Sequence, residues 1–161
     1  MIIAKKLEQS NLQMGALKNV LAFFCLGSVL YIFISLVSYS SLDPSLSSIS
    51  SLSGDIQNLG GPFGAYLSDA LFSVIGIGAY LFIAIISFAA VKTLFFYHRT
   101  DRLHKAIQIA SAIFLISSFS ALCEFYYSGD YFPQSSSGGL VGNLIFTNLS
   151  NIFGVVGSLI F

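Results

Sequence analysis

The sequence predicts an all-α, polytopic membrane domain, and two features of its composition point to this class. Of the 161 residues, 55% are hydrophobic and only 9% are charged, whereas about a quarter of the residues in an average soluble domain are charged. The apolar residues also form long uninterrupted runs, which match the hydrocarbon core of a bilayer, about 30 Å thick. We therefore expect residues 1–161 to form a single domain that folds in lipid.

The charged residues are segregated along the chain, although the formal net charge is zero. Short cytoplasmic loops of membrane proteins carry an excess of Lys and Arg. We therefore predict that residues 1–18 and 93–105 are cytoplasmic and that residues 40–58 and 124–137 are external. The predicted topology-setting residues are all seven basic residues of the chain: Lys5, Lys6, Lys18, Lys92, Arg99, Arg102 and Lys105.

Three apolar runs are predicted to cross the bilayer, at residues 20–39, 76–96 and 106–123. A cleavable signal peptide is the competing interpretation of the N-terminus. The first run is longer than the apolar region of a usual signal peptide, and no small-x-small cleavage site follows it. Cys25 and Cys123 are expected near opposite membrane faces, too far apart for a disulfide, which requires Cα atoms within about 7 Å.

Two glycine motifs are superimposed by a single offset of 78 residues, without a gap. The offset places Gly60, Gly61, Gly64 and Gly76 on Gly138, Gly139, Gly142 and Gly154. We infer two tandem repeats, at about 19–97 and 106–161, each with a span, an external loop, the glycine motif, an amphipathic segment and a further span. The second repeat would then end inside its last span, so we expect the chain to be a fragment.

The amphipathic segments, residues 62–75 and 140–153, are predicted to be short external helices that lie over the outer ends of the spans. In the first segment the apolar face is expected to be the packed one, with Ser68, Asp69 and Ser73 on the opposite face. A fourth span would then start at about residue 154. The alternative is that residues 140–161 form this span by themselves, because a run of this length can cross the bilayer.

The sequence around these motifs resembles a known family. The residues that carry the resemblance lie at 38–45, in the Asn-Leu-Gly-Gly stretch with the residues that follow it, and at 138–142. They resemble the N-terminal four-transmembrane-span domain of the FtsK/SpoIIIE-type bacterial DNA translocases, over about residues 36–157. The motif residues are Asn58, Leu59, Gly60, Gly61, Pro62, Gly64, Asp69, Gly76, Gly138, Gly139, Gly142 and Gly154.

The resemblance implies a membrane anchor in the bacterial inner membrane, with a cytoplasmic N-terminus and a position at the division septum. It implies division-machinery partners and a homo-oligomer, which is a hexamer in the full-length family. It also implies a linker leading to a motor that uses ATP and magnesium to move DNA. The linker and the motor are absent from this sequence, which contains no Gly-x-x-x-x-Gly-Lys-Ser/Thr phosphate loop. We therefore expect this chain to have no enzymatic activity, no cofactor and no direct DNA contact.

Other candidate sites have simpler interpretations. His98 and His104 flank basic residues in a predicted hydrated loop, with no third metal ligand nearby. Asp69 and Glu124 are expected at the membrane interface, and Asn148 fits a glycosylation tripeptide by its letters only. A small transporter or channel subunit built on an internal repeat is the alternative function. The near absence of charge within the spans favours the non-catalytic anchor and interaction domain.

Overall fold

The computed structural model describes residues 2–46, 56–95, 102–127 and 136–158, and within these ranges all regular secondary structure is helical. This confirms the all-α class. The helices are α1 (Ile2–Val37), α2 (Gly61–Ile75), α3 (Gly78–Phe95), α4 (Arg102–Tyr126) and α5 (Gly139–Gly157).

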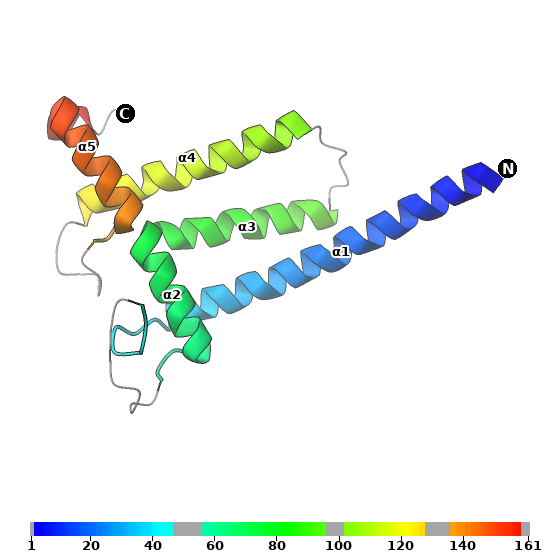
Figure 1. Cartoon of the computed structure of the whole chain (residues 1–161), viewed down its shortest axis with the longest axis horizontal. Coiled ribbons are helices and arrows are strands. Elements are labelled where there is room, and N and C mark those ends of the chain that lie inside the picture. The colour runs from blue at the N-terminus through cyan, green and yellow to red at the C-terminus, as the bar shows by residue number, and fades with distance from the viewer. Residues whose placement is uncertain (1, 47–55, 96–101, 128–135, 159–161) are drawn as a thin grey trace.

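Three of these helices are long and apolar enough to cross a membrane: α3, α4 and the part of α1 from Gly15 to Val37. They run side by side, with α3 between α1 and α4 (Figure 1). The predicted spans at 76–96 and 106–123 are therefore confirmed, although α4 extends beyond its predicted span at both ends. Large apolar side chains such as Phe24, Phe88 and Phe114 remain exposed on these helices, as expected for surfaces that face lipid.

The first helix is longer than the sequence predicted. We expected a span at residues 20–39, but α1 already begins at Ile2 and ends at Val37. The early start has a local cause, because the segment before the apolar run is rich in Lys, Leu, Glu, Gln, Met and Ala, which all have high helix propensity. Their polarity excluded them from a predicted span, but it does not oppose helix formation.

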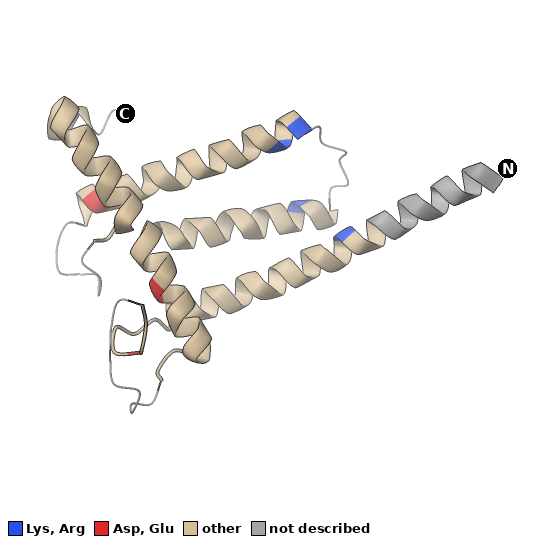
Figure 2. Cartoon of the chain, in the orientation of Figure 1, with Lys and Arg blue, Asp and Glu red and all other residues tan. Residues whose placement is uncertain are grey.

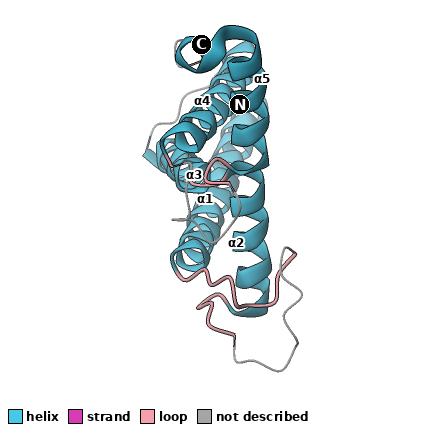
Figure 3. Ribbon diagram, turned by 90° about the vertical axis from the view of Figure 1, so that its left-hand side faces the viewer, coloured by secondary structure: helices cyan, strands magenta, loops and turns pink. Residues whose placement is uncertain are grey.

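The two shorter helices lie across one end of the spans. Helix α2 covers the ends of α1 and α3, and α5 covers the end of α4, so that the two helices follow one another along the same edge of the molecule (Figures 1 and 3). Between α2 and α3 the chain turns at Gly76, where φ is +55°. The predicted break between the short helix and the second span is thus confirmed.

Helix α5 is also interrupted, at Gly154. This residue has φ +71° and ψ 168°, which is not helical. The alternative of one unbroken span over residues 140–161 is therefore wrong, because the chain changes direction within that segment. The turn lies where a fourth span was predicted to start, while residues 159–161 lie outside the described residues.

The buried core lies where α1, α2 and α3 meet. It consists of Val29 and Leu36 from α1, Phe72 from α2, and Ala79 and Ile83 from α3. Phe72 packs edge-on against the rings of Tyr39 and Tyr80, at centroid distances of 5.1 and 5.8 Å. The core therefore fixes α2 across the ends of the two spans.

Candidate functional site

The candidate site is the cap, which we define as α2, α5 and the described loop residues 38–46, 56–60 and 136–138. Figure 2 shows that the described Lys and Arg residues lie at the opposite end of the spans, whereas the described acidic residues lie at or near the cap. Lys18, Lys92, Arg102 and Lys105 are all exposed at the basic end. Lys5 and Lys6 belong to α1, but their side chains and the whole of Arg99 lie outside the description.

Asn58 organises the start of α2. Its side-chain oxygen accepts a hydrogen bond from Gly60 N (2.8 Å), and its amide nitrogen donates to Ser35 O on α1 (2.8 Å). The Asp43 carboxylate accepts hydrogen bonds from the backbone N–H groups of Gln57 (2.8 Å) and Asn58 (2.9 Å). Both side chains are buried, so each polar group has partners that offset the cost of its removal from water.

Glu124 organises the start of α5 in a related way. Its carboxylate accepts hydrogen bonds from Ser136 Oγ (2.6 Å) and from Gly138 N (2.9 Å). Gly60 and Gly138 occupy the same position in the two predicted repeats, so the same backbone N–H is bound by a carboxamide in one motif and by a carboxylate in the other. Negative groups are favoured at helix N-termini because unpaired N–H groups point outward there.

Each glycine motif packs against a serine of the preceding span. A Cβ atom on Gly64 would lie 2.7 Å from Ser35 Oγ, and one on Gly142 would lie 2.7 Å from the carbonyl carbon of Ser120. Both approaches are closer than real Cβ contacts allow. Glycine therefore permits α2 to approach α1, and α5 to approach α4, more closely than any other residue would.

The orientation of α2 corrects the predicted one. We expected the apolar face to cover the spans, but Ser68 and Asp69 are completely buried, whereas Phe63 is 68% exposed. The polar face can pack inward because hydrogen-bonding partners lie beneath it. Tyr39 OH donates to Asp69 Oδ1 (3.1 Å), and Asn58 Nδ2 donates to Ser68 Oγ (3.4 Å). Asp69 is thus a buried residue rather than an interfacial one.

The end of α2 meets the start of α5 in a backbone contact, which we call the internal joint. Ile77 N donates to Ser137 O (2.9 Å), and Ser120 Oγ donates to Ile75 O (2.9 Å). A Cβ atom on Gly76 would lie 2.6 Å from Gly139 N, and one on Gly139 would lie 2.5 Å from Gly76 N. The two predicted repeats therefore contact each other through the backbone of these glycines.

The remaining motif residues line the turn before α2. Tyr31 OH donates to Gly60 O (2.6 Å), and Leu59 N donates to Ser38 Oγ (2.9 Å). Gly61 has φ +66°, and Pro62 occupies the first turn of the helix, where its missing N–H costs nothing. The side chain of Leu59 is 79% exposed. The structure thus places the predicted motif residues in the cap, except Gly76, which directly follows α2 at its edge.

The residues that hold the motifs in place were not predicted from the sequence. Ser35 and Ser120 lie inside apolar spans, and Tyr31 and Tyr39 lie on or just after α1. Hydroxyl groups at the outer ends of otherwise apolar runs were a signal available in the sequence. Nothing in it, however, indicates which of the many Ser residues contacts a glycine motif.

The described residues outside the cap contain no constellation of catalytic or ligand-binding groups. They include no group of three His, Cys, Asp or Glu residues that could hold a metal ion, and His104 is exposed on α4. His98 lies outside the described residues. Cys25 and Cys123 are free thiols, in agreement with the prediction that they do not pair.

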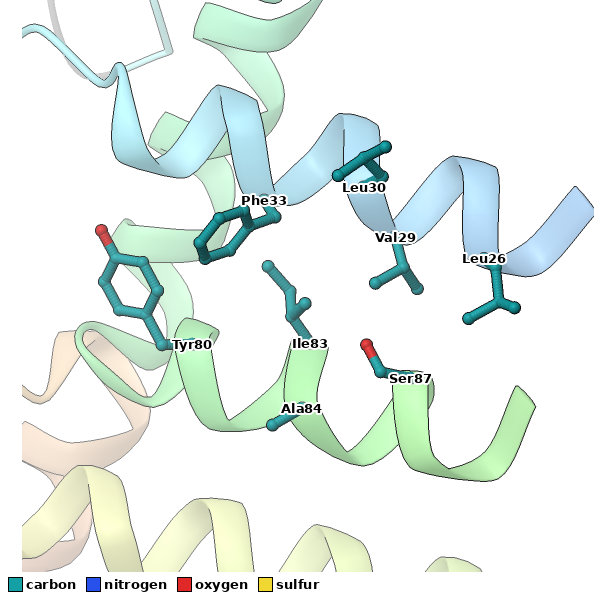
Figure 4. Close-up of a pocket in the computed structure, with 8 residues that line it drawn as sticks. All are labelled: Leu26, Val29, Leu30, Phe33, Tyr80, Ile83, Ala84 and Ser87. Atoms are coloured by element: carbon teal, nitrogen blue, oxygen red, sulfur yellow. The ribbon is translucent and has the colours of Figure 1, made fainter. Parts of the chain in front are cut away.

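The grooves between the spans are apolar. One lies between α1 and α3, where Val29 and Phe33 face Ile83, with Tyr80 and Ser87 as its polar members (Figure 4). Another, between α3 and α4, is lined by apolar side chains and two serines. A third, between α1 and α3 toward the basic end, includes Lys18. Grooves of this kind suit acyl chains better than a polar substrate.

Three apolar spans with two helices across one end define a polytopic helical membrane domain. The chain belongs to the family described as the 4TM region of DNA translocase FtsK/SpoIIIE, whose sequence model matches residues 15–161. It is accordingly the multi-pass inner-membrane region that this family describes. No solved structure matches the chain.

Individual relatives agree with this assignment. DNA translocase FtsK 1 of Neisseria meningitidis serogroup A is 31% identical over 141 residues, which are 84% of this chain and 17% of the relative. DNA translocase FtsK of Shewanella oneidensis is 34% identical over 120 residues, which are 71% of this chain and 13% of the relative. The chain therefore spans less than a fifth of the length of these relatives, and it corresponds to their membrane region and not to their motor.

Proposed function

We propose that this chain is a non-catalytic membrane anchor whose cap is an external docking platform for the division machinery. The observation that carries the proposal is the separation of charge along the spans: the exposed basic residues lie at one end, and the cap with its acids lies at the other (Figure 2). Because basic residues stay on the cytoplasmic side, the cap would face the exterior, with the N-terminus inside.

The build of the cap supports docking. Its polar groups are used internally, by Asp43, Asn58 and Glu124, to hold the two glycine motifs in place. Leu42 and Leu46, in the loop after α1, are by contrast 72% and 73% exposed. Large apolar side chains that are exposed beyond the ends of membrane spans are typical of protein contact surfaces.

In the full-length protein, ATP hydrolysis and DNA translocation would belong to a motor outside this chain, with ATP and magnesium as its cofactors. DNA affinity requires many phosphate contacts, and the four exposed basic residues described here are spread over three helices. The transporter alternative lacks support, because the grooves between the spans are lined mainly by apolar side chains.

The docking role predicts an effect on localisation. In dividing cells, the intact protein with a fluorescent tag and the changes Leu42→Ser and Leu46→Ser should lose most of its septal enrichment at unchanged membrane level. Leu103→Ser is the matched control, because Leu103 is 70% exposed at the basic end and should leave localisation unaltered. Full septal enrichment of the Leu42 and Leu46 double variant would exclude this loop as the docking surface.

A further inference from the structure

The internal joint leaves two complementary surfaces of the cap uncovered. In the repeat, Gly154 corresponds to Gly76 and Gly61 corresponds to Gly139. A Cβ atom on Gly76 or Gly139 would collide with the backbone of the other repeat, whereas one on Gly154 or Gly61 would meet no atom of the described residues within 4 Å. Among the residues that the structure describes, the surface that binds in the middle of the cap is therefore open at both of its ends.

The glycines at the open ends share the positive φ of the glycines in the internal joint. Gly61 and Gly139 have φ +66° and +63°, and Gly76 and Gly154 have φ +55° and +71°. The open turn at Asn58 is already held in its shape by hydrogen bonds to Ser35 and Gly60. Little rearrangement of this turn would be needed for a second joint, which reduces the cost of ordering on binding.

We propose that copies of this chain associate head to tail by repeating the internal joint, with the Gly154 end of α5 in one copy against the Leu59–Gly61 turn in the next. The backbone hydrogen bond from Ile77 N to Ser137 O in the internal joint would have its counterpart between Val155 N and Leu59 O. The side chains of Leu59 and Val155, 79% and 52% exposed, would be covered by this contact.

A second copy is the occupant that the structure favours. The two open surfaces belong to the same chain. The Gly154 surface corresponds to the Gly76 surface and the Leu59–Gly61 turn corresponds to the Ser137–Gly139 turn, and the latter two already bind each other in the internal joint. Such a contact joins two different patches, so it continues from copy to copy and closes into a ring or runs on as a row. The inference rests on the proposed repeat but not on the proposed division role.

Cysteine cross-linking of the intact protein in its native membrane tests this contact. Two tagged copies are co-produced, one with Leu59→Cys and the other with Val155→Cys, and the membranes are oxidised. A disulfide-linked mixed dimer is expected, because residues joined by a backbone hydrogen bond have Cα atoms within the span of a disulfide. Ser137→Cys with Ile77→Cys in one chain calibrates the geometry, since it should form the intrachain bridge.

Two controls separate this joint from other contacts. Leu144→Cys replaces Val155→Cys in the first, because Leu144 is also exposed on α5 but lies well before Gly154; it should give no mixed dimer. The second introduces the same cysteine, either Leu59→Cys or Val155→Cys, into both copies, and it should also give no dimer. Equal cross-linking in either control, or no mixed dimer from Leu59→Cys and Val155→Cys, would overturn the proposal.

A glycine pair provides an independent test. Gly61→Ala and Gly139→Ala impose a similar backbone cost, because both residues have a similar positive φ. Gly139→Ala would also collide with α2 of its own chain, so it should lower the thermal stability of the protein more. Gly61→Ala should instead lower the yield of the mixed dimer about tenfold, which corresponds to a loss of about 1.4 kcal/mol in the free energy of association. An unchanged yield with Gly61→Ala would contradict the proposed contact.

Discussion

Asp69 is a carboxylic acid with no exposed surface in the cap of a membrane domain. The Tyr39 hydroxyl donates to it at 3.1 Å, and Phe72, one turn further along α2, packs against the Tyr39 ring. The hydrogen bond and the ring contact therefore tie α2 to the same tyrosine. This position is a structural one, and it does not resemble the proton-carrying acid of a transporter, which faces a water-filled path.

We expect Asp69→Ala to lower the free energy of unfolding by about 1–3 kcal/mol, because the partly buried Tyr39 hydroxyl loses its acceptor. Asp69→Asn should lose less, since the carboxamide oxygen can still accept from Tyr39. Thermal denaturation of the purified protein in detergent measures both effects. Tyr66→Phe is the control, because Tyr66 is exposed on the same helix. An Asp69→Ala protein as stable as the parent would show that this hydrogen bond contributes nothing.

Helices α2 and α3 show which boundaries can be predicted from sequence. The break between them was expected at Gly76, and the structure places it there, because the backbone at this residue has a positive φ that favours glycine. The packed face of α2 was predicted wrongly, because the hydrophobic pattern alone assigns Ser68 and Asp69 to the outside. Their burial depends on Asn58 and Tyr39, which are distant in sequence and give no periodic signal.

At the turn between α2 and α3, we expect Gly76→Ala to be among the most destabilising substitutions of a glycine in this protein. The alanine would adopt a backbone conformation that costs about 1–3 kcal/mol, and its Cβ atom would collide with the backbone at Gly138 and Gly139. Loss of folded protein on heating in detergent measures the effect.

Gly27→Ala is the matched control for this change. Gly27 lies inside α1, where a Cβ atom meets nothing within 4 Å. Alanine is the better helix former by about 1 kcal/mol, so this variant should be at least as stable as the parent. Equal stability of the two variants would contradict the role assigned to the turn at Gly76.

For the whole molecule, the composition predicted the class, and the glycine motifs predicted the cap. The arrangement of α2 and α5 in one row could not be predicted, because it depends on the internal joint, whose hydrogen bonds join residues such as Ile77 and Ser137 that are far apart in sequence. These hydrogen bonds use backbone N–H and C=O groups, which are not specific to any residue type, so they give no signal in the sequence. Only the glycines that allow the approach leave a trace in the sequence.

The proposed orientation of the whole domain predicts which residues a membrane-impermeant thiol reagent can reach. Leu46→Cys should react in intact cells, because Leu46 is exposed in the loop at the cap. Thr100→Cys, in the basic loop between the second and third spans, should react only after the membrane is opened. Labelling of Thr100→Cys in intact cells, with Leu46→Cys protected, would reverse the orientation and place the cap inside the cell.

The length of α1 has a mechanical consequence. Its apolar part, Gly15–Val37, is enough to cross the bilayer, and residues 2–14 continue the same helix for about 20 Å more at 1.5 Å per residue. The helix extends beyond the ends of α3 and α4 (Figure 1), so its N-terminal part projects from the basic side of the membrane domain. A group at the N-terminal end of α1 is held at a defined distance from the bilayer surface. A small tilt of the membrane-embedded part of the helix would displace this end laterally.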